Sequence, residues 1–412
     1  MRAALSHVGG PSRVEGDAAL GAALATAFDV GEGDAPAARA HVHGFHSYPA
    51  RMHATTARRL LEALAEPTSV VLDPFCGSGT VLVEARLRGL RAIGTDVNPL
   101  AIRLASLKTR GVPASERQEL VDAARWAQRM TTERRTEHAK PTQRYEDVDV
   151  RLFEPHVLLE LDSIRWAIDR VEPPALRDDL ELVFSSILTK VSRRRGDSGT
   201  YLEPRRLAPG FCAKMLVARA EELAGQLQAY AAALPPGAPA TDVHSDDART
   251  LGTLGAATVD VVVTSPPYAA TYDYVDHHDV RLRWLRLRTD RFAKLELGAR
   301  RDYARLTQPA AEERWHDELG RTLAAIARVL RPGGRAALVL GDSAVAGRSL
   351  RALPVVTEVA AAAGLQLLAV ASQERPHFHL PTRRAFAEGS REEHLIALGK
   401  VAAGRASGTG AQ

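Results

Sequence analysis

The sequence predicts an α/β protein with a doubly wound, mostly parallel sheet and a helical insertion. An apolar strand, a glycine-rich turn, a helix and a second strand follow one another between residues 69 and 95. Apolar strands return after residue 241. Between these two stretches, residues 111–239 place their apolar side chains at helical spacing only. This order predicts one sheet whose chain is interrupted by a helical unit.

The first half of the sheet is predicted before residue 110. Glu66-Pro67 and Gly89 end the first two helices, and Pro99 suits the first turn of a third. Its two strands lead into Asp73 and Asp96. The predicted elements are a helix at 52–64, a strand at 69–72, a helix at 80–88, a strand at 91–95 and a helix from residue 99.

The helical insertion and the second half of the sheet follow. We expect about seven strands in total, the last two separated by a loop. The insertion is predicted to contain helices at 115–132, 155–170, 176–190 and 209–234. The second half is predicted to contain strands at 241–244, 258–263, 335–340, 365–372 and 394–398, with helices at 311–330 and 350–363.

The two ends of the chain lack clear periodicity and are rich in small residues, which favours disorder. The predicted organisation is therefore a disordered segment at 1–40, sheet halves at 41–110 and 241–400, the insertion at 111–240, and a disordered tail at 401–412.

Composition excludes several classes of protein. In 412 residues no apolar run approaches the ~20 needed to cross a membrane, and no signal peptide is apparent, so we expect a cytoplasmic protein. Two cysteines, Cys76 and Cys212, cannot build a disulfide framework. The histidines lack the spacing of a metal site, and we predict no metal. A net charge of +4 permits a nucleic-acid partner without requiring one.

The segment Asp73–Thr80, DPFCGSGT, is a glycine-rich turn between a strand and a helix. Such turns bind ligands because backbone N–H groups face the crevice at the carboxyl ends of the strands. Gly77 and Gly79 allow close approach of the backbone. The turn lacks the lysine of a P-loop and the full G-x-G-x-x-G spacing, and its spacing alone equally allows a nucleotide site.

The segment Thr264–Tyr268, TSPPY, follows another apolar strand. Ser265 offers a side-chain oxygen and Pro266 a carbonyl, and the two prolines fix the backbone that carries these acceptors. Tyr268 offers a face for a flat ring. Together these groups favour a site for an amino group attached to an aromatic ring, although such a turn can also be purely structural.

The pair of motifs resembles the cofactor and catalytic motifs of the S-adenosylmethionine-dependent DNA amino-methyltransferases, and the TSPPY form resembles the N4-cytosine branch. The resemblance implies a class I methyltransferase-like sheet with an antiparallel final hairpin, S-adenosylmethionine as cofactor and DNA as partner. It implies catalytic roles for Ser265, Pro266, Pro267 and Tyr268.

The resemblance also implies the cofactor contacts. Asp73 would accept from the methionine ammonium and Asp96 from the ribose hydroxyls, while Asp247, or Asp246 in its place, would face the adenine amino group. His46–Met52 matches, more loosely, a segment that closes over the methionine end. The implied cofactor-binding residues are Tyr48, Asp73, Phe75, Gly77, Gly79, Thr80, Asp96, Asn98 and Asp247.

Other functions stay open at this point. The same site could methylate adenine N6, or guanine N2 in RNA, or the chain could be a catalytically silent nucleic-acid-binding module. Methylation at carbon 5 of cytosine needs a cysteine nucleophile, and the Pro-Cys dipeptide of that family is missing.

Two arginine-rich segments are candidates for phosphate contacts. The first choice is a basic cluster in the insertion, formed by Lys190, Arg193, Arg194, Arg195, Arg205 and Arg206. The second is a predicted helix at 275–288, whose Arg281, Arg283, Arg286 and Arg288 could instead form a solvated face over a core stripe.

Overall fold

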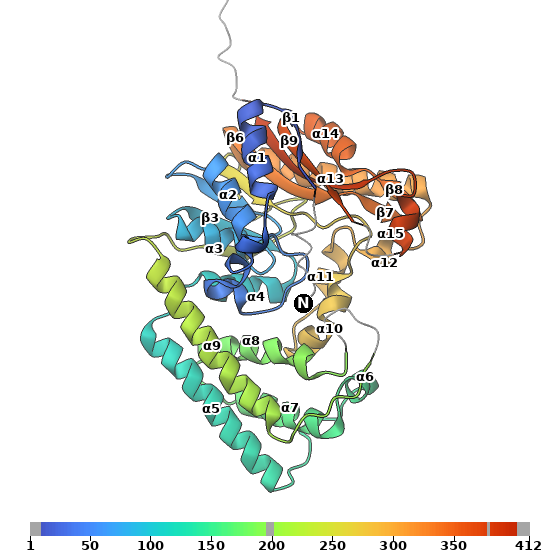
Figure 1. Ribbon diagram of the computed structural model, residues 1–412. Coiled ribbons are helices and arrows are strands. Elements are labelled where there is room, and N and C mark those ends of the chain that lie inside the picture. Colours follow the sequence, from blue (N-terminus) through green and yellow to red (C-terminus); the bar gives the residue numbers. More distant parts are fainter. Residues whose placement is uncertain (1–9, 195–201, 377–379, 402–412) are drawn as a thin grey trace, which may run out of the picture.

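The computed structural model describes residues 10–194, 202–376 and 380–401. Within them the chain builds an eight-stranded sheet in the order β1-β9-β10-β6-β5-β2-β3-β4 (Figure 1). The strands are β1 Arg13–Gly16, β2 Val70–Asp73, β3 Arg91–Asp96, β4 Asp242–Ser245, β5 Val259–Thr264, β6 Leu330–Gly341, β9 Leu365–Arg375 and β10 Arg391–Lys400.

Strands β4, β3, β2, β5 and β6 are parallel, and β10 is inserted antiparallel between β6 and β9. Without β1, this is the class I methyltransferase sheet, so the predicted fold class is confirmed. Successive side chains point to opposite faces: Val71 packs on one side of the sheet and Leu72 on the other, both fully buried.

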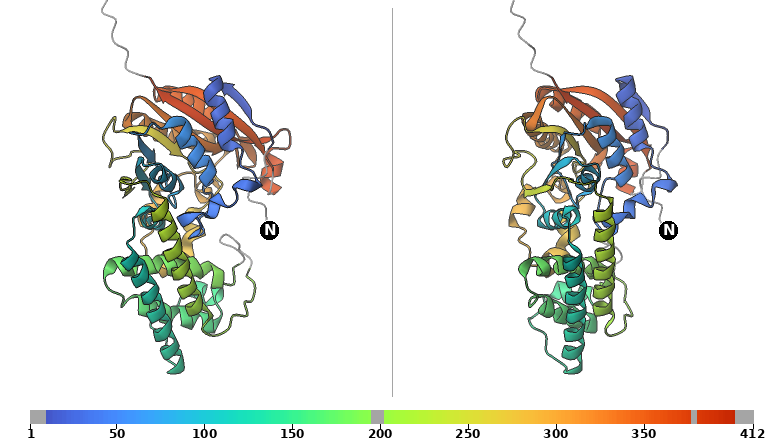
Figure 2. Two further views of the ribbon diagram at one scale, coloured as in Figure 1. Left: turned by 60° about the vertical axis from the view of Figure 1, so that its left-hand side comes forward. Right: turned by 90° about the vertical axis from the view of Figure 1, so that its left-hand side faces the viewer.

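Helices cover both faces of the sheet (Figures 1 and 2). Leu24, Leu60 and Leu82 pack on one face from α1, α2 and α3, while Leu323 and Val356 pack on the other from α13 and α14. Helix α4 packs between the sheet and the insertion. These helices are α1 Ala18–Phe28, α2 Ala54–Leu64, α3 Thr80–Leu87, α4 Pro99–Thr109, α13 Gln308–Val329 and α14 Ala352–Ala362.

The prediction of disorder at 1–40 is wrong for residues 10–40. Strand β1 pairs antiparallel with the outer edge of β9, and Asp17 caps α1 by accepting from the Leu20 N–H at 2.8 Å. The apolar side of α1, with Leu24 and Phe28, then packs on the sheet. The order comes from contacts with strands about 350 residues later, which local periodicity does not report. Residues 1–9 and nearly all of the tail, 402–412, lie outside the described residues.

The insertion is helical, as predicted, and extends away from the sheet (Figure 2). Its core also includes Val280, Leu282 and Trp284 of α10, which lies beyond residue 240 in the sequence. The helices are α5 Ala114–Thr136, α6 Asp147–Leu152, α7 Pro155–Ile168, α8 Pro174–Val191, α9 Phe211–Ala233 and α10 Tyr274–Trp284.

Smaller elements complete the second half. Helix α15, Leu380–Ala385, lies between β9 and β10, where the sequence predicted only a loop. Helices α11 Asp290–Leu295 and α12 Arg300–Tyr303 follow α10, and a hairpin of β7 Ser343–Val345 and β8 Arg348–Leu350 follows β6. No helix in the described ranges is long and apolar enough to cross a membrane.

Candidate active site

A pocket lies at the carboxyl ends of β2, β3 and β5, where the two motifs meet. Parallel strands end at the same edge of a sheet, so turns far apart in the sequence become neighbours there. The predicted site residues that line the pocket are Tyr48, Asp73, Phe75, Gly77, Thr80, Asp96, Asn98, Asp247, Ser265 and Pro267. Gly79, Pro266 and Tyr268 do not line it.

Two glycines shape the cofactor turn. Gly77 has φ +48°, and a Cβ there would lie 3.0 Å from the Tyr48 ring. Gly79, the residue before α3, has φ +85°, and a Cβ there would lie 3.1 Å from the backbone of Ala105. Both the left-handed backbone and the close neighbours disfavour a side chain at these positions.

Asp96 is held at the pocket by backbone donors. Its carboxylate accepts from the Gly77 N–H at 2.9 Å and from the Asn98 N–H at 2.8 Å. Burial raises the pKa of Asp96 to about 6, despite these hydrogen bonds. The Asn98 side-chain amide donates to the Tyr48 hydroxyl at 3.1 Å, so Tyr48 is fixed from the same turn.

Asp73 lies at the end of β2 and is 4% exposed. Its Oδ1 accepts from the Thr264 hydroxyl at 2.7 Å and from the Phe75 N–H at 3.1 Å. Burial raises the pKa of Asp73 to about 7, the nearby Asp96 adding a smaller contribution. Thus one carboxyl joins the cofactor turn to the strand that carries the TSPPY motif.

The two candidate adenine-binding acids both line the pocket. Asp246 accepts from the Thr253 hydroxyl at 2.6 Å and the Thr253 N–H at 2.8 Å. The Asp247 carboxylate faces the Arg249 guanidinium at 2.9 Å. Both acids keep further acceptor sites, so the geometry does not choose between them.

The pocket also contains polar groups that test its fit to S-adenosylmethionine, and one of them, Ser78, was not among the predicted site residues. The buried Ser78 and Thr80 hydroxyls have no hydrogen-bond partner among the described residues. Leaving such groups unpaired costs about 1–3 kcal/mol each, so a polar ligand group is expected beside them. Arg51 adds the single basic side chain of the described lining. Hydroxyls and a guanidinium suit a carboxylate, and the acids described above suit an ammonium and ribose hydroxyls.

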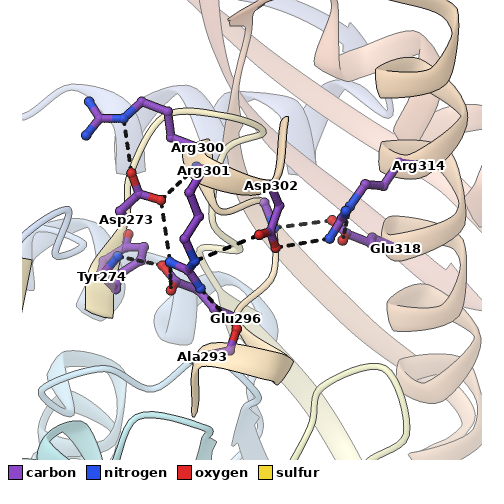
Figure 3. A network of polar contacts seen from close by, with 10 residues as sticks. Asp273, Tyr274, Ala293, Glu296, Arg300, Arg301, Asp302, Arg314 and Glu318 are labelled. Carbon is purple, nitrogen blue, oxygen red and sulfur yellow. Dashed lines mark hydrogen bonds and ion pairs between the residues drawn. The ribbon is translucent and has the colours of Figure 1, made fainter. Parts of the chain in front are cut away.

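The far wall of the pocket is formed by Tyr274 and Glu296, from α10 and the end of α11. Glu296 is 4% exposed, accepts from the Tyr274 N–H and pairs with Arg301 at 2.7 Å. Figure 3 shows Arg301 between Asp273 and Glu296. No motif or periodicity marks Glu296, because its position depends on α11 folding back over the pocket.

The catalytic turn divides between the pocket and its surroundings. Ser265 and Pro267 line the pocket, while Pro266 is buried. The Tyr268 ring lies against Gly341, and its hydroxyl donates to Glu393. Burial and the Glu393 carboxylate raise the pKa of Tyr268 well above its ordinary value, so the hydroxyl stays protonated.

The predicted arginine contacts need correction. Arg281 is fully buried and donates to Ser47 at 2.8 Å and to Thr189 at 3.1 Å, so it faces neither solvent nor phosphate. Arg283 pairs with Asp149 and Asp279. These arginines join α10 to the insertion and to the cofactor-binding segment. The alternation of arginines with apolar residues in the sequence does not distinguish this structural role from phosphate binding or a solvated face.

The basic cluster of the insertion also makes ion pairs and hydrogen bonds within the protein. Arg194 pairs with Asp279 at 3.1 Å, and Arg193 lies 3.5 Å from Glu154. Arg205 donates to the Lys190 carbonyl, Arg206 is exposed, and Arg195 lies outside the described residues.

Comparisons with known proteins find similarities to methyltransferases. Residues 31–107 match the protein family described as DNA methylase. The chain is 26% identical over 270 residues to the Type II methyltransferase M.MvaI of Kocuria varians, covering 61% of this chain and 59% of that protein. It is 34% identical over 68 residues to the Type II methyltransferase M.MjaII of Methanocaldococcus jannaschii, covering 16% and 13% of the two chains. A SAM-dependent methyltransferase from Methanosarcina mazei aligns with TM-score 0.34 and 10% identity, over 87% and 99% of the two chains.

The strand order and the pocket define a class I methyltransferase fold whose cofactor is S-adenosylmethionine. The match to the DNA methylase family covers residues 31–107, which contain the cofactor turn but not the TSPPY turn. It spans about three fifths of the length of the first curated relative.

Proposed function

We propose that the protein transfers a methyl group from S-adenosylmethionine to the exocyclic amino group of a base in DNA, with cytosine N4 as the first candidate. The observation that carries this proposal is the hydrogen bond from Thr264 to Asp73. It holds the TSPPY turn against the cofactor turn, so that Ser265 and Pro267 line the same pocket as Asp96.

The amine of a base is a poor nucleophile because its lone pair is delocalised into the ring. Acceptors on its hydrogens favour a pyramidal nitrogen and offset the positive charge that develops as the methyl group arrives. In this proposal the Ser265 hydroxyl and the Pro266 carbonyl are those acceptors, and Tyr268 stacks on the extruded base. The proton leaves the methylated nitrogen to water, so no side chain of matched pKa is required.

The proposed cofactor roles are those that the resemblance implies, and they fall on residues that line the pocket. Asp96 accepts from the ribose hydroxyls, Asp73 faces the methionine ammonium, and Asp247 or Asp246 faces the adenine amino group. Ser78, Thr80 and Arg51 would hold the methionine carboxylate. The cofactor supplies the electrophilic methyl group on a sulfonium, and the chain's carboxylates favour that positive charge.

Cytosine N4 is preferred over adenine N6 because the turn begins Thr-Ser, whereas most adenine-modifying relatives carry an aspartate there. The DNA methylase family that matches residues 31–107 supports DNA as the substrate.

The test is mass spectrometry of nucleosides after DNA or RNA is incubated with the protein and methyl-labelled cofactor. We expect label in N4-methylcytosine from DNA. Label in N6-methyladenine would show that the target base is adenine. Label in N2-methylguanine from RNA would show that the substrate is RNA. If the protein binds the cofactor but labels no nucleoside, the remaining hypothesis is the catalytically silent nucleic-acid-binding module.

In the same assay, the variant Ser265→Ala tests whether the Ser265 hydroxyl takes part in catalysis. We expect its single-turnover rate to fall ~10²-fold or more, the scale of one lost preorganised hydrogen-bonding group, with cofactor affinity little changed. Ser115→Ala, on the exposed start of α5, is the matched control.

A further inference from the structure

Tyr268 is held by a glycine on the neighbouring strand. A Cβ at Gly341 would lie 2.7 Å from Cε2 of the Tyr268 ring, closer than side chains pack. Gly341 ends β6 and has no positive φ, so its backbone does not require glycine. Instead, the Tyr268 ring occupies the space that a side chain at residue 341 would fill.

The residue paired with Gly341 fixes the other end of the tyrosine. Glu393 on β10 lies opposite Gly341 in the antiparallel register, and its Oε1 accepts from the Tyr268 hydroxyl. One cross-strand pair thus supplies both the room for the ring and the acceptor for its hydroxyl.

Glu393 is itself fixed from β9. Its Oε2 accepts from Arg375 Nε at 2.8 Å and from Nη2 at 2.7 Å, and the Arg375 side chain is 9% exposed. The geometry is bidentate at the guanidinium, which gives directional as well as electrostatic restraint. The Arg375 guanidinium lies over the Phe28 ring, 5.1 Å from its centroid. Phe28 ends α1, so the N-terminal segment reaches this network.

We propose that Glu393 and Arg375 are positioning residues that hold the Tyr268 ring for the extruded base, with Gly341 and the α1 segment completing the support. This inference rests on the proposed function. A ring fixed before binding loses less freedom when a base stacks on it, and small misplacements in such sites cost up to ~10²-fold in rate. The Gly341 contact and the hydrogen bond at the hydroxyl thus restrain the ring before a base stacks on it.

The first test is a double-mutant cycle on the single-turnover methylation rate. We expect Glu393→Ala to lower the rate on the order of 10–100-fold with S-adenosylmethionine affinity unchanged, and Glu393→Gln, which keeps an acceptor, to retain more of the rate. If Glu393 acts through Tyr268, adding Glu393→Ala to Tyr268→Phe should lower the rate no further. Fully additive losses would overturn the inference. Glu374→Ala, an exposed acid next to Arg375 on β9, is the matched control.

The second test needs no activity, and so separates this inference from the proposed function. The protein, with its eight tyrosines replaced by 3-fluorotyrosine, is examined by ¹⁹F NMR, and Tyr268→Phe assigns the Tyr268 signal. We expect one narrow signal that shifts or broadens in Glu393→Ala but not in Glu374→Ala. An unaltered signal would show that Glu393 does not hold the ring, whatever the activity. A shifted signal in a protein that methylates no base would instead reject the proposed function.

Discussion

The Thr264 hydroxyl donates to the Asp73 carboxylate at 2.7 Å, although 191 residues separate them in the chain. Thr264 is the last residue of β5 and Asp73 the last of β2, and these strands are parallel neighbours at the centre of the sheet. Both side chains are buried, so the bond is shielded from water. The cofactor turn and the catalytic turn are therefore fixed relative to one another before any ligand binds.

Thr264→Val removes this bond while keeping the size of the side chain. We expect S-adenosylmethionine to bind about 1 kcal/mol more weakly at neutral pH, because Asp73 loses a donor that favours its charged form. Titration calorimetry measures the change, with Thr357→Val on the exposed side of α14 as control. An affinity equal to the parent's would mean that the bond does not support cofactor binding.

Asp96→Ala should weaken S-adenosylmethionine binding by about 1.5–3 kcal/mol, the scale of charge-assisted hydrogen bonds left unmade. The variant also leaves the Gly77 and Asn98 N–H groups without their acceptor. Asp122→Ala, an exposed acid on α5, controls for the change of net charge. Calorimetry with unchanged affinity would remove Asp96 from the cofactor site.

Cofactor affinity should depend on pH because both pocket acids titrate near neutrality. Burial raises the pKa of Asp73 to about 7 and that of Asp96 to about 6, from an ordinary 3.8. Below these values the acids are protonated and offer no charge to the cationic cofactor, so affinity should rise between about pH 5.5 and 8. Calorimetry across this range should show the rise, and Asp73→Asn should lose its upper part. A flat profile in the parent would contradict the assignment.

The same pKa values determine whether the stability of the ligand-free protein rises or falls with pH. The folded protein keeps protons on Asp73 and Asp96 that the unfolded chain releases above pH 3.8. Their contribution to the stability of the ligand-free protein is therefore largest at low pH and is lost as pH rises to about 7. Thermal unfolding with and without cofactor should show that ligand stabilisation grows over this window.

Gly341→Ala should displace the Tyr268 ring, because the new methyl group would lie 2.7 Å from it. We expect the methylation rate to fall on the order of tenfold or more, while cofactor affinity changes little, since neither residue lines the cofactor pocket. Gly320→Ala is the control: it lies in α13, where a Cβ has no neighbour closer than 3.7 Å. Equal rates in the parent and Gly341→Ala would show that the ring tolerates displacement.

The sequence by itself determined the parts of this protein that depend on local chemistry. Asp73–Thr80 needs glycines for its left-handed turns, and Thr264–Tyr268 needs prolines to fix its backbone, so both motifs are readable without a structure. Alternating strands and helices likewise predicted the sheet and its helical insertion, because periodicity follows from which face is buried.

Only the tertiary structure decided which residues surround those motifs. Glu296 reaches the pocket because α11 folds back over it, and Glu393 meets Tyr268 because β10 is inserted beside β6. Arg281 lies on an arginine-rich helix, yet it is buried against the cofactor-binding segment. The N-terminal segment is ordered by pairing with β9 at the other end of the chain. These contacts join residues far apart in sequence, and local propensity does not record the packing free energy that brings them together.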